Sequence, residues 1–298
     1  MKSKPNKPSA RKRFRHAIDQ ELREHRSSFI AFSVLRFLVI ATMIRQGFLG
    51  NYESVFFCAL TILLLYVPSW VQVRMKMELP PALEITILCF IFAAEILGEV
   101  HAFYIRIQGW DTMLHTLNGF LAAAVGFSLV VILNDDERLT FDLSPVFMAL
   151  FAFCFSMTVG VLWEFFEFGM DCFFRTDMQK DTVLNAIYTV TLDPTATNKV
   201  VAMPNIQEVF INGEDLGVGG YLDIGLYDTM KDMIVNFIGA AVFSVAGFFY
   251  VKSKGKTRTM AQNFVPTPKT HETDYLAMLE EQDQKSEDSD HEQTTPQS

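Results

Sequence analysis

The chain has 298 residues, of which 50% are hydrophobic and 28 are phenylalanine, and its formal net charge at pH 7 is -9. Charged residues are concentrated in the first 28 positions, in the connections and in the last 45 positions. A soluble core does not need so much apolar sequence, so the composition indicates an integral membrane protein with the lipid bilayer as its surroundings. The negative charge argues against nucleic-acid binding.

Long apolar segments define the expected elements. Each can cross a hydrocarbon core of about 30 Å, because a helix rises about 1.5 Å per residue. Lipid admits only helices or closed barrels, and these segments lack the alternating pattern of barrel strands. The sequence therefore predicts an all-α fold, a polytopic transmembrane bundle of about six helices. In chain order they are expected at about residues 29–49, 54–73, 82–103, 111–133, 145–173 and 221–251.

Lysine and arginine are distributed unevenly among the connections. Residues 1–28 carry nine of them, and the turns after the second and fourth segments and the flank after the sixth carry more. The turns near 50–53 and 104–109 carry only Arg106. Because positive residues stay on the cytoplasmic side, we expect both termini in the cytoplasm and the chain in the plasma membrane. The first segment is too long for a signal-peptide core, which predicts an uncleaved anchor.

The remaining regions differ in composition from the helices. Residues 1–28 form a basic cytoplasmic segment, and residues 29–252 form the bundle. Residues 253–298 are hydrophilic and end in an acidic stretch, so we expect a disordered cytoplasmic tail with a cytoplasmic protein as its partner. The connection 174–220 is long for a small bundle, and we expect an extracytoplasmic subdomain or a lid there.

Polar side chains recur at spacings of three or four inside three of the apolar segments. Such positions share one face of a helix. An ionisable group in hydrocarbon costs about 2.5 to 3.5 kcal/mol, so these faces should meet inside the bundle. The predicted orientation places them all toward the extracytoplasmic end, with Glu95 and Glu99 nearby and Arg45 of the first helix as a counter-charge. The candidate ligands of this acidic cup are Asp111, His115, Glu164, Glu167, Asp171, Asp228, Asp232 and Asn236.

Carboxylates with one imidazole suit Mg²⁺, Mn²⁺ or Zn²⁺, and several carboxylates crowded together cannot all ionise without a cation or shared protons. The leading hypothesis is a divalent-metal-dependent hydrolase or transferase that attacks a phosphate or acyl bond of a lipid-linked substrate. In it, His115 is a ligand or general base, Glu164 is a ligand, and Arg45 contacts a phosphate.

Two alternatives use the same residues. A cation- or proton-coupled transporter would need more polar residues in the cytoplasmic half, where the sequence has few. A scaffold or sensor would use the stripes only structurally, with Asp111 and His115 as a hydrogen-bonded pair and Asn236 as a bridge between helices. Gly119, Gly160 and Gly239 are expected to allow close helix approach and need no catalytic role.

Several chemistries lack a motif. The four cysteines have no Cys-x-x-Cys spacing, which argues against a disulfide framework or a zinc knuckle. The glycines at 217–220 have no strand before them and no P-loop lysine after them, and a Gly-x-Ser-x-Gly motif is absent. Neither a nucleotide site nor a serine hydrolase is indicated.

Three motifs carry a resemblance to a known family. W-D-T-M-L-H-T-L-N-G-F from Trp110, W-E-F-F-E-F from Trp163 and Y-D-T-M-K-D-M-I-V-N-F-I-G-A from Tyr227 resemble the YjdF-like family of bacterial inner-membrane proteins. The first motif also looks distantly like VanZ-like proteins. The resemblance covers about the third to sixth helices and implies a multi-pass protein of the bacterial inner membrane, with no particular reaction. The positions that it singles out are Asp111, His115, Trp163, Glu164, Glu167, Asp228, Asp232 and Asn236.

Overall fold

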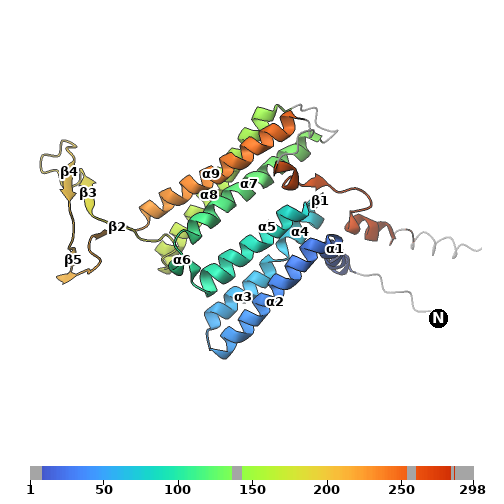
Figure 1. Cartoon of the computed structure of the whole chain (residues 1–298), viewed down its shortest axis with the longest axis horizontal. Helices are drawn as coiled ribbons and strands as arrows, with labels where there is room; N and C mark the ends of the chain where they lie inside the picture. The colour runs from blue at the N-terminus through green and yellow to red at the C-terminus, as the bar shows by residue number, and fades with distance from the viewer. Residues whose placement is uncertain (1–8, 136–142, 254–259, 283–284, 286–298) are drawn as a thin grey trace, which may run out of the picture.

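The computed structural model describes residues 9–135, 143–253, 260–282 and 285, and this part of the chain is mostly helical (Figure 1). The first half of the molecule contains α1 (Ala10–Glu24), α2 (Arg26–Phe48), α3 (Tyr52–Leu64), α4 (Val67–Met75), α5 (Pro81–Phe92), the π-helix η1 (Ala93–Val100) and the short α6 (Phe103–Arg106). The second half contains α7 (Trp110–Asp135), α8 (Pro145–Phe174) and α9 (Leu226–Lys252). The predicted all-α membrane fold is confirmed.

Five helical stretches in the described residues are long and apolar enough to cross a membrane. They are α2, the stretch Tyr52–Met75 formed by α3 and α4, α7, α8 and α9. The expected segment 82–103 appears as α5 continued by η1, where the hydrogen-bonding pattern widens to the π form. The helix between 54 and 73 is interrupted near Pro68, because proline lacks the backbone N–H that a helix interior requires.

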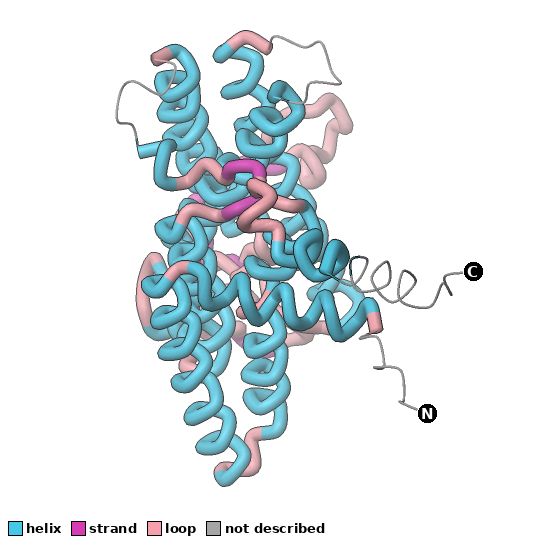
Figure 2. Tube along the Cα trace, turned by 90° about the vertical axis from the view of Figure 1, so that its right-hand side faces the viewer, coloured by secondary structure: helices cyan, strands magenta, loops and turns pink. Residues whose placement is uncertain are grey.

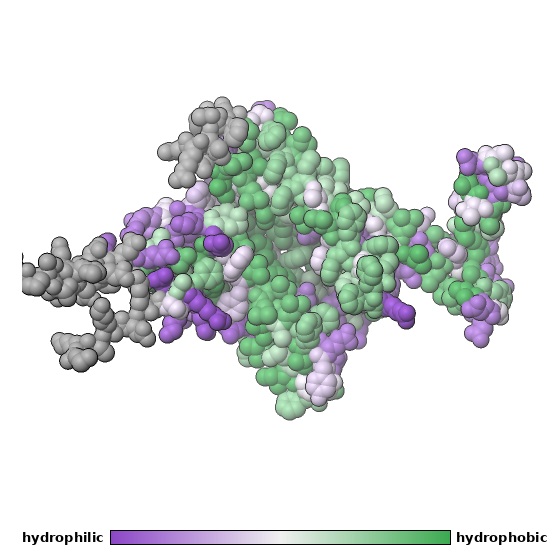
Figure 3. All heavy atoms as spheres, turned by 180° about the vertical axis from the view of Figure 1, so that it is seen from behind, coloured by the Kyte–Doolittle hydropathy of each residue, from purple (hydrophilic) through white to green (hydrophobic). Residues whose placement is uncertain are grey.

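The helices form two groups, α2, α3 and α5 with η1, and α7, α8 and α9, which Figures 1 and 2 show side by side. A hydrophobic surface covers the bundle between a hydrophilic end at α1 and a partly hydrophilic end formed by the connection between α8 and α9 (Figure 3). This apolar surface is the one expected of a protein surrounded by lipid.

Glycines bring α7 and α9 together over the most extensive helix contact of the described chain. A Cβ added at Gly119 would lie 2.1 Å from the backbone oxygen of Asn236, and one added at Gly239 would lie 2.0 Å from the backbone oxygen of Thr116. Only glycine fits at such distances, since the neighbouring atoms are backbone. The predicted close approach at these glycines is confirmed.

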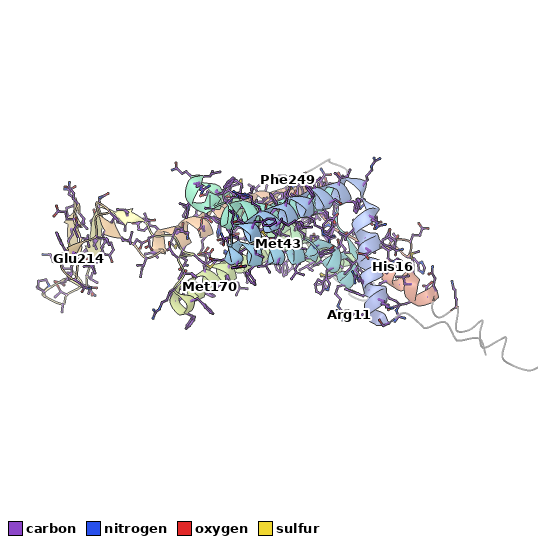
Figure 4. The ribbon with its side chains drawn as sticks, turned by 90° about the horizontal axis from the view of Figure 1, so that it is seen from below. Arg11, His16, Met43, Met170, Glu214 and Phe249 are labelled. Atoms are coloured by element: carbon purple, nitrogen blue, oxygen red, sulfur yellow. The ribbon has the colours of Figure 1, made fainter. Side chains whose placement is uncertain are left out.

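The connection between α8 and α9 forms an arm of short antiparallel ladders that extends away from the bundle (Figure 1). Its ladders pair β2 (Val183–Leu184) with β7 (Tyr221–Leu222), β3 (Ala186–Thr189) with β4 (Val201–Pro204), and β5 (Phe210–Ile211) with β6 (Glu214–Asp215). Glu214 on this arm and His16 on α1 lie at opposite ends of the molecule (Figure 4). The connection is therefore a projecting subdomain, and most of it does not form a lid.

The segment after α9 packs against the other end of the bundle. Its strand β8 (Thr267–Pro268) pairs with β1 (Met77–Glu78), and a short 3₁₀ helix, η2 (Met260–Asn263), precedes it. Val265 is buried in the core cluster that contains Leu83 and Phe120. Within the expected disordered tail, the described residues 260–282 pack against the bundle, because apolar side chains and a strand partner distant in sequence give this segment a place to pack. The disorder of the tail as a whole stays a prediction. Residues 283–284 and 286–298 lie outside the described part.

The same end of the bundle holds α1. Lys269 forms an ion pair with Glu21 of α1, and both side chains are almost fully buried. Lys76 lies 3.2 Å from Asp274. The basic N-terminal segment and the described C-terminal segment therefore share one end of the molecule, opposite the arm.

Candidate functional site

The site is built from the ends of three helices next to the arm. Asp111 and His115 occupy the first turns of α7, Glu164 and Glu167 the last turns of α8, and Asp232 the second turn of α9. The residues on α7 and α8 lie four and three apart, and Asp232 lies four after Asp228 on α9, so each helix presents its polar residues on one face. The three faces meet between the helices, as the spacing predicts.

His115 stands at the centre of this arrangement. Its Nε2 atom lies 3.4 Å from Asp111 Oδ1 and 3.9 Å from Asp232 Oδ2. Its Nδ1 atom lies 3.9 Å from Glu164 Oε1. The side chain is 11% exposed, and both ring nitrogens face carboxylate oxygens. One imidazole is therefore shared between carboxylates of three helices.

Two groups of possible metal ligands result, each with its ligand atoms within 4.8 Å of one another. Asp111, His115 and Asp232 form one, and His115, Glu164 and Glu167 form the other. The second group is buried throughout. Of the eight predicted ligands, the structure brings these five together.

Lys231 is the cation of this site, and sequence reasoning missed it. Its Nζ atom lies 3.1 Å from Asp228 Oδ1, 3.6 Å from Asp111 Oδ2 and 3.7 Å from Asp232 Oδ1. The signal was present in the sequence, because a lysine three residues after Asp228 and next to Asp232 lies on the edge of the acidic face.

The family description "predicted membrane protein (DUF2238)" matches residues 31–253 of this chain, which is most of its length and all of the site. The chain belongs to the DUF2238 family. The DUF2238 match begins in α2 and thus reaches beyond the third to sixth helices that the YjdF-like resemblance covers. That description mentions neither YjdF nor VanZ, so both resemblances stay predictions. No curated protein and no solved structure matches the chain.

In this DUF2238 protein, Asp171 has a different task from the one predicted. Its carboxylate accepts hydrogen bonds from the backbone N–H groups of Met178 and Gln179, at 2.6 and 2.9 Å, and from the hydroxyl of Thr176. It thereby fixes the chain that leaves α8 rather than joining the group around His115. Asp171 lies in the last turn of α8, where its side chain can reach the chain that follows the helix, and helical spacing alone could not show this contact.

The chain held by Asp171 closes over part of the site. The side-chain amide of Gln179 donates to Glu164 Oε2 at 3.4 Å and to the hydroxyl of Thr229 at 2.7 Å. The backbone N–H of Lys180 donates to Asp228 Oδ2 at 2.8 Å. Asp228 thus anchors this cover as well as contacting Lys231. Only these first residues of the connection act as a lid.

Asn236 lies one turn deeper than Asp232 and links helices instead of facing the carboxylates. Its side chain accepts from Asn118 at 3.4 Å and donates to the backbone oxygen of Ser156 at 3.5 Å. A Cβ on Gly160 would lie 2.7 Å from its amide nitrogen. The structural interpretation of Asn236, as a bridge between helices, is the one that these contacts support.

Arg45 was expected as the counter-charge, and the structure places it elsewhere. It lies exposed on α2, whose main contacts are with α3 and α5 rather than with the helices of the site. Equal depth in the membrane does not imply proximity, because helices at one depth are also separated laterally. Lys231 takes the place that the sequence assigned to Arg45. Glu95 and Glu99 lie on η1, outside both ligand groups.

A groove of about 270 Å³ borders the site between α7 and α8. Asn118, Val159, Leu162 and Trp163 line it. The indole N–H of Trp163 donates to Glu167 Oε1 at 2.8 Å, so one residue belongs to both the groove and the site. Leu162 is 60% exposed on the surface of α8 that faces the surroundings of the bundle. The groove therefore opens to the apolar exterior and adjoins the site at Trp163.

Proposed function

We propose that this site binds a divalent cation, Mg²⁺, Mn²⁺ or Zn²⁺, and that the protein is a metal-dependent hydrolase or transferase acting on a lipid-linked substrate. The proposal includes a location in the bacterial plasma membrane with both termini cytoplasmic and the site toward the other side. The location of α1 and the C-terminal segment at the end opposite the site supports this orientation.

The observation that carries the proposal is the buried imidazole between carboxylates. No hydrogen bond closes the gap between either ring nitrogen of His115 and its neighbours in the described chain. Asp111 Oδ2 and Asp232 Oδ1 accept no hydrogen bond there, but Lys231 Nζ lies 3.6 and 3.7 Å from them. Glu164 and Glu167 are buried with the neutral donors Gln179 and Trp163, and a cation beside His115 would compensate their charge.

The ligand set fits the cation. Carboxylate oxygens and imidazole nitrogen bind all three ions, and Zn²⁺ in catalytic sites commonly has three such protein ligands and one open position. A bound ion of this kind polarises a carbonyl or phosphoryl oxygen and lowers the pKa of a coordinated water. His115, Glu164 and Glu167 would hold the ion, the aspartates would orient the imidazole, and Gln179, which donates to Glu164, would restrict the access of water.

The groove supports a substrate that lies in the membrane. It lies between helices that the apolar surface marks as membrane-spanning, and it reaches Glu167 through Trp163. An acyl or prenyl chain is the molecule that such a groove meets first in a bilayer. A lipid-linked phosphate or ester could then present its bond to the site.

The transporter alternative finds less support in the interior. Beyond Asn236, toward the other end of the bundle, Ala123, Phe127 and Phe243 are fully buried between the helices. A path for protons or cations needs polar groups along its length. The buried polar groups in this stretch are the single hydroxyls of Ser128 and Ser244, and ionisable side chains are absent from the described buried residues of α7 and α9 there.

The test is metal content and metal-dependent stability of the detergent-purified protein. We expect the wild type to retain a divalent ion, and chelator to lower its melting temperature reversibly. Glu164→Gln should lower bound metal and abolish the response to chelator, while Glu214→Gln on the arm should behave as wild type. A wild type without metal, whose melting is indifferent to Mg²⁺, Mn²⁺ and Zn²⁺, would contradict the proposal.

A further inference from the structure

The carboxylates of the site differ in their counter-charges. Asp111, Asp228 and Asp232 share one ammonium group, because Lys231 Nζ lies between 3.1 and 3.7 Å from an oxygen of each. Asp228 also accepts a backbone hydrogen bond from the cover over the site. Three negative groups are thus gathered around one fixed positive charge on the α7–α9 side.

In the part of the chain that the structure describes, no lysine or arginine forms an ion pair with Glu164 or Glu167 on the α8 side. Glu167 receives the indole N–H of Trp163, and Glu164 receives the amide of Gln179. Both donors are neutral. The two glutamates are 5% and 7% exposed, so little solvent reaches them. Two buried carboxylates with neutral donors need either a proton or a positive charge close by, and a bound cation supplies the second.

The chemistry of imidazole allows one metal at His115. A neutral imidazole has one nitrogen with a lone pair for a metal, and the other carries a hydrogen. Metal-bound histidine typically donates that hydrogen to a carboxylate. Nδ1 faces Glu164, and Nε2 faces Asp111 and Asp232. A metal on the Nδ1 side therefore leaves Nε2–H for the aspartates, whose charge Lys231 already balances.

We propose, on the basis of the cation binding proposed above, that a single divalent ion binds between His115 Nδ1, Glu164 and Glu167, and that the Lys231 ammonium occupies the position of a second cation among the three aspartates. The protein then has a one-metal site with a built-in lysine in place of the second ion. The lysine is 47% exposed, so the ammonium lies at the edge of the site, where an anionic group of a substrate would approach.

The test begins with the stoichiometry and affinity of Mn²⁺ or Zn²⁺ in the purified full-length protein, by elemental analysis and titration. We expect one equivalent in the wild type. Glu164→Gln and Glu167→Gln should weaken binding at least tenfold more than Asp111→Asn and Asp232→Asn, because the glutamates are ligands and the aspartates orient His115. Thermal melting in the presence of chelator identifies any variant that fails to fold. If one glutamate variant or one aspartate variant does not fold, the other of the same kind still gives the comparison.

Lys231 supplies the decisive comparison. Lys231→Met should expose the aspartate group and raise the stoichiometry toward two, while Lys231→Arg, which keeps the charge, should remain at one. Adding Asp232→Asn to Lys231→Met should remove the second equivalent and leave the first.

The outcomes separate the two proposals. A wild type without metal overturns both. If the wild type binds one equivalent of metal, and the aspartate variants lose it while the glutamate variants keep it, the position assigned to the ion is wrong. The proposed metal dependence then stays intact. Two equivalents in the wild type, or one equivalent in Lys231→Met, overturn the role of the lysine.

Discussion

The contact between α7 and α9 predicts a large effect of one added methyl group. In Gly239→Ala the new Cβ would lie 2.0 Å from the backbone oxygen of Thr116 and 2.8 Å from the backbone nitrogen of Phe120. Ordinary contact begins at 3.4 Å, so α7 and α9 must separate by about 1.4 Å. Backbone atoms in the middle of two helices cannot rotate away as a side chain would.

The cost follows from overpacking. Forcing a methyl group into a packed interface costs about 1 to 3 kcal/mol, and the clash with backbone places this substitution at or above the upper end. The separation also strains the bridge of Asn236 and displaces Asp232 from His115. We therefore expect Gly239→Ala to unfold more easily than the wild type.

Gly169→Ala is the matched control, because a Cβ at Gly169 of α8 meets nothing within 4 Å. Alanine is preferred over glycine in helices by about 1 kcal/mol, so this variant should be as stable as wild type or more stable. Thermal melting in detergent compares the two variants. Equal stability of Gly239→Ala and Gly169→Ala would refute the close packing described between α7 and α9.

Three further predictions concern the end opposite the site and the orientation. Lys269→Met leaves Glu21 buried without its partner and should lower the free energy of unfolding by about 3 kcal/mol. Adding Glu21→Gln to this variant should restore most of the loss. Equal melting temperatures of the single and the double variant would contradict the ion pair. Burial raises the pKa of Glu21 from 4.5 to about 7, against the opposing effect of Lys269. The folded state therefore binds the Glu21 proton more tightly than the unfolded chain does. The free energy of unfolding should fall as the pH rises from 4.5 to about 7, by about 3 kcal/mol at most. A Glu21→Gln variant whose stability has the same pH profile as the wild type would contradict this. Reporter fusions at Asn51 should read extracytoplasmic and those at Glu78 cytoplasmic, and inverted readings would reverse the orientation of the site.

The local periodicity of helices made much of the site predictable. Asp111 and His115 share a face because they are four residues apart, and the same holds for Asp228 and Asp232. These relations depend only on residues within one helix. Burial of a polar stripe then follows from the cost of exposing it to lipid.

The features that the sequence did not reveal depend on contacts between distant residues or on long side chains. Lys231 reaches all three aspartates because its chain is flexible, and Asp171 turns to the loop because α8 ends at Phe174. Arg45 is separated from the site by the lateral arrangement of helices, which charge and depth do not determine. The packed segment around Val265 depends on a strand partner nearly two hundred residues earlier.

The pairing of β1 with β8 has a consequence for the order of folding. The segment 260–268 is synthesised after every membrane-spanning helix, yet Val265 packs with α5 and α7 and Phe264 lies 5.1 Å from Phe120, measured between ring centroids. The helices can insert one after another during translation, but this end of the bundle can reach its final packing only when the late segment arrives. Until then, the apolar surface that receives Val265 stays open. Ribosome-bound chains that stop before residue 260 should therefore be the forms that most need chaperones to protect them from proteases.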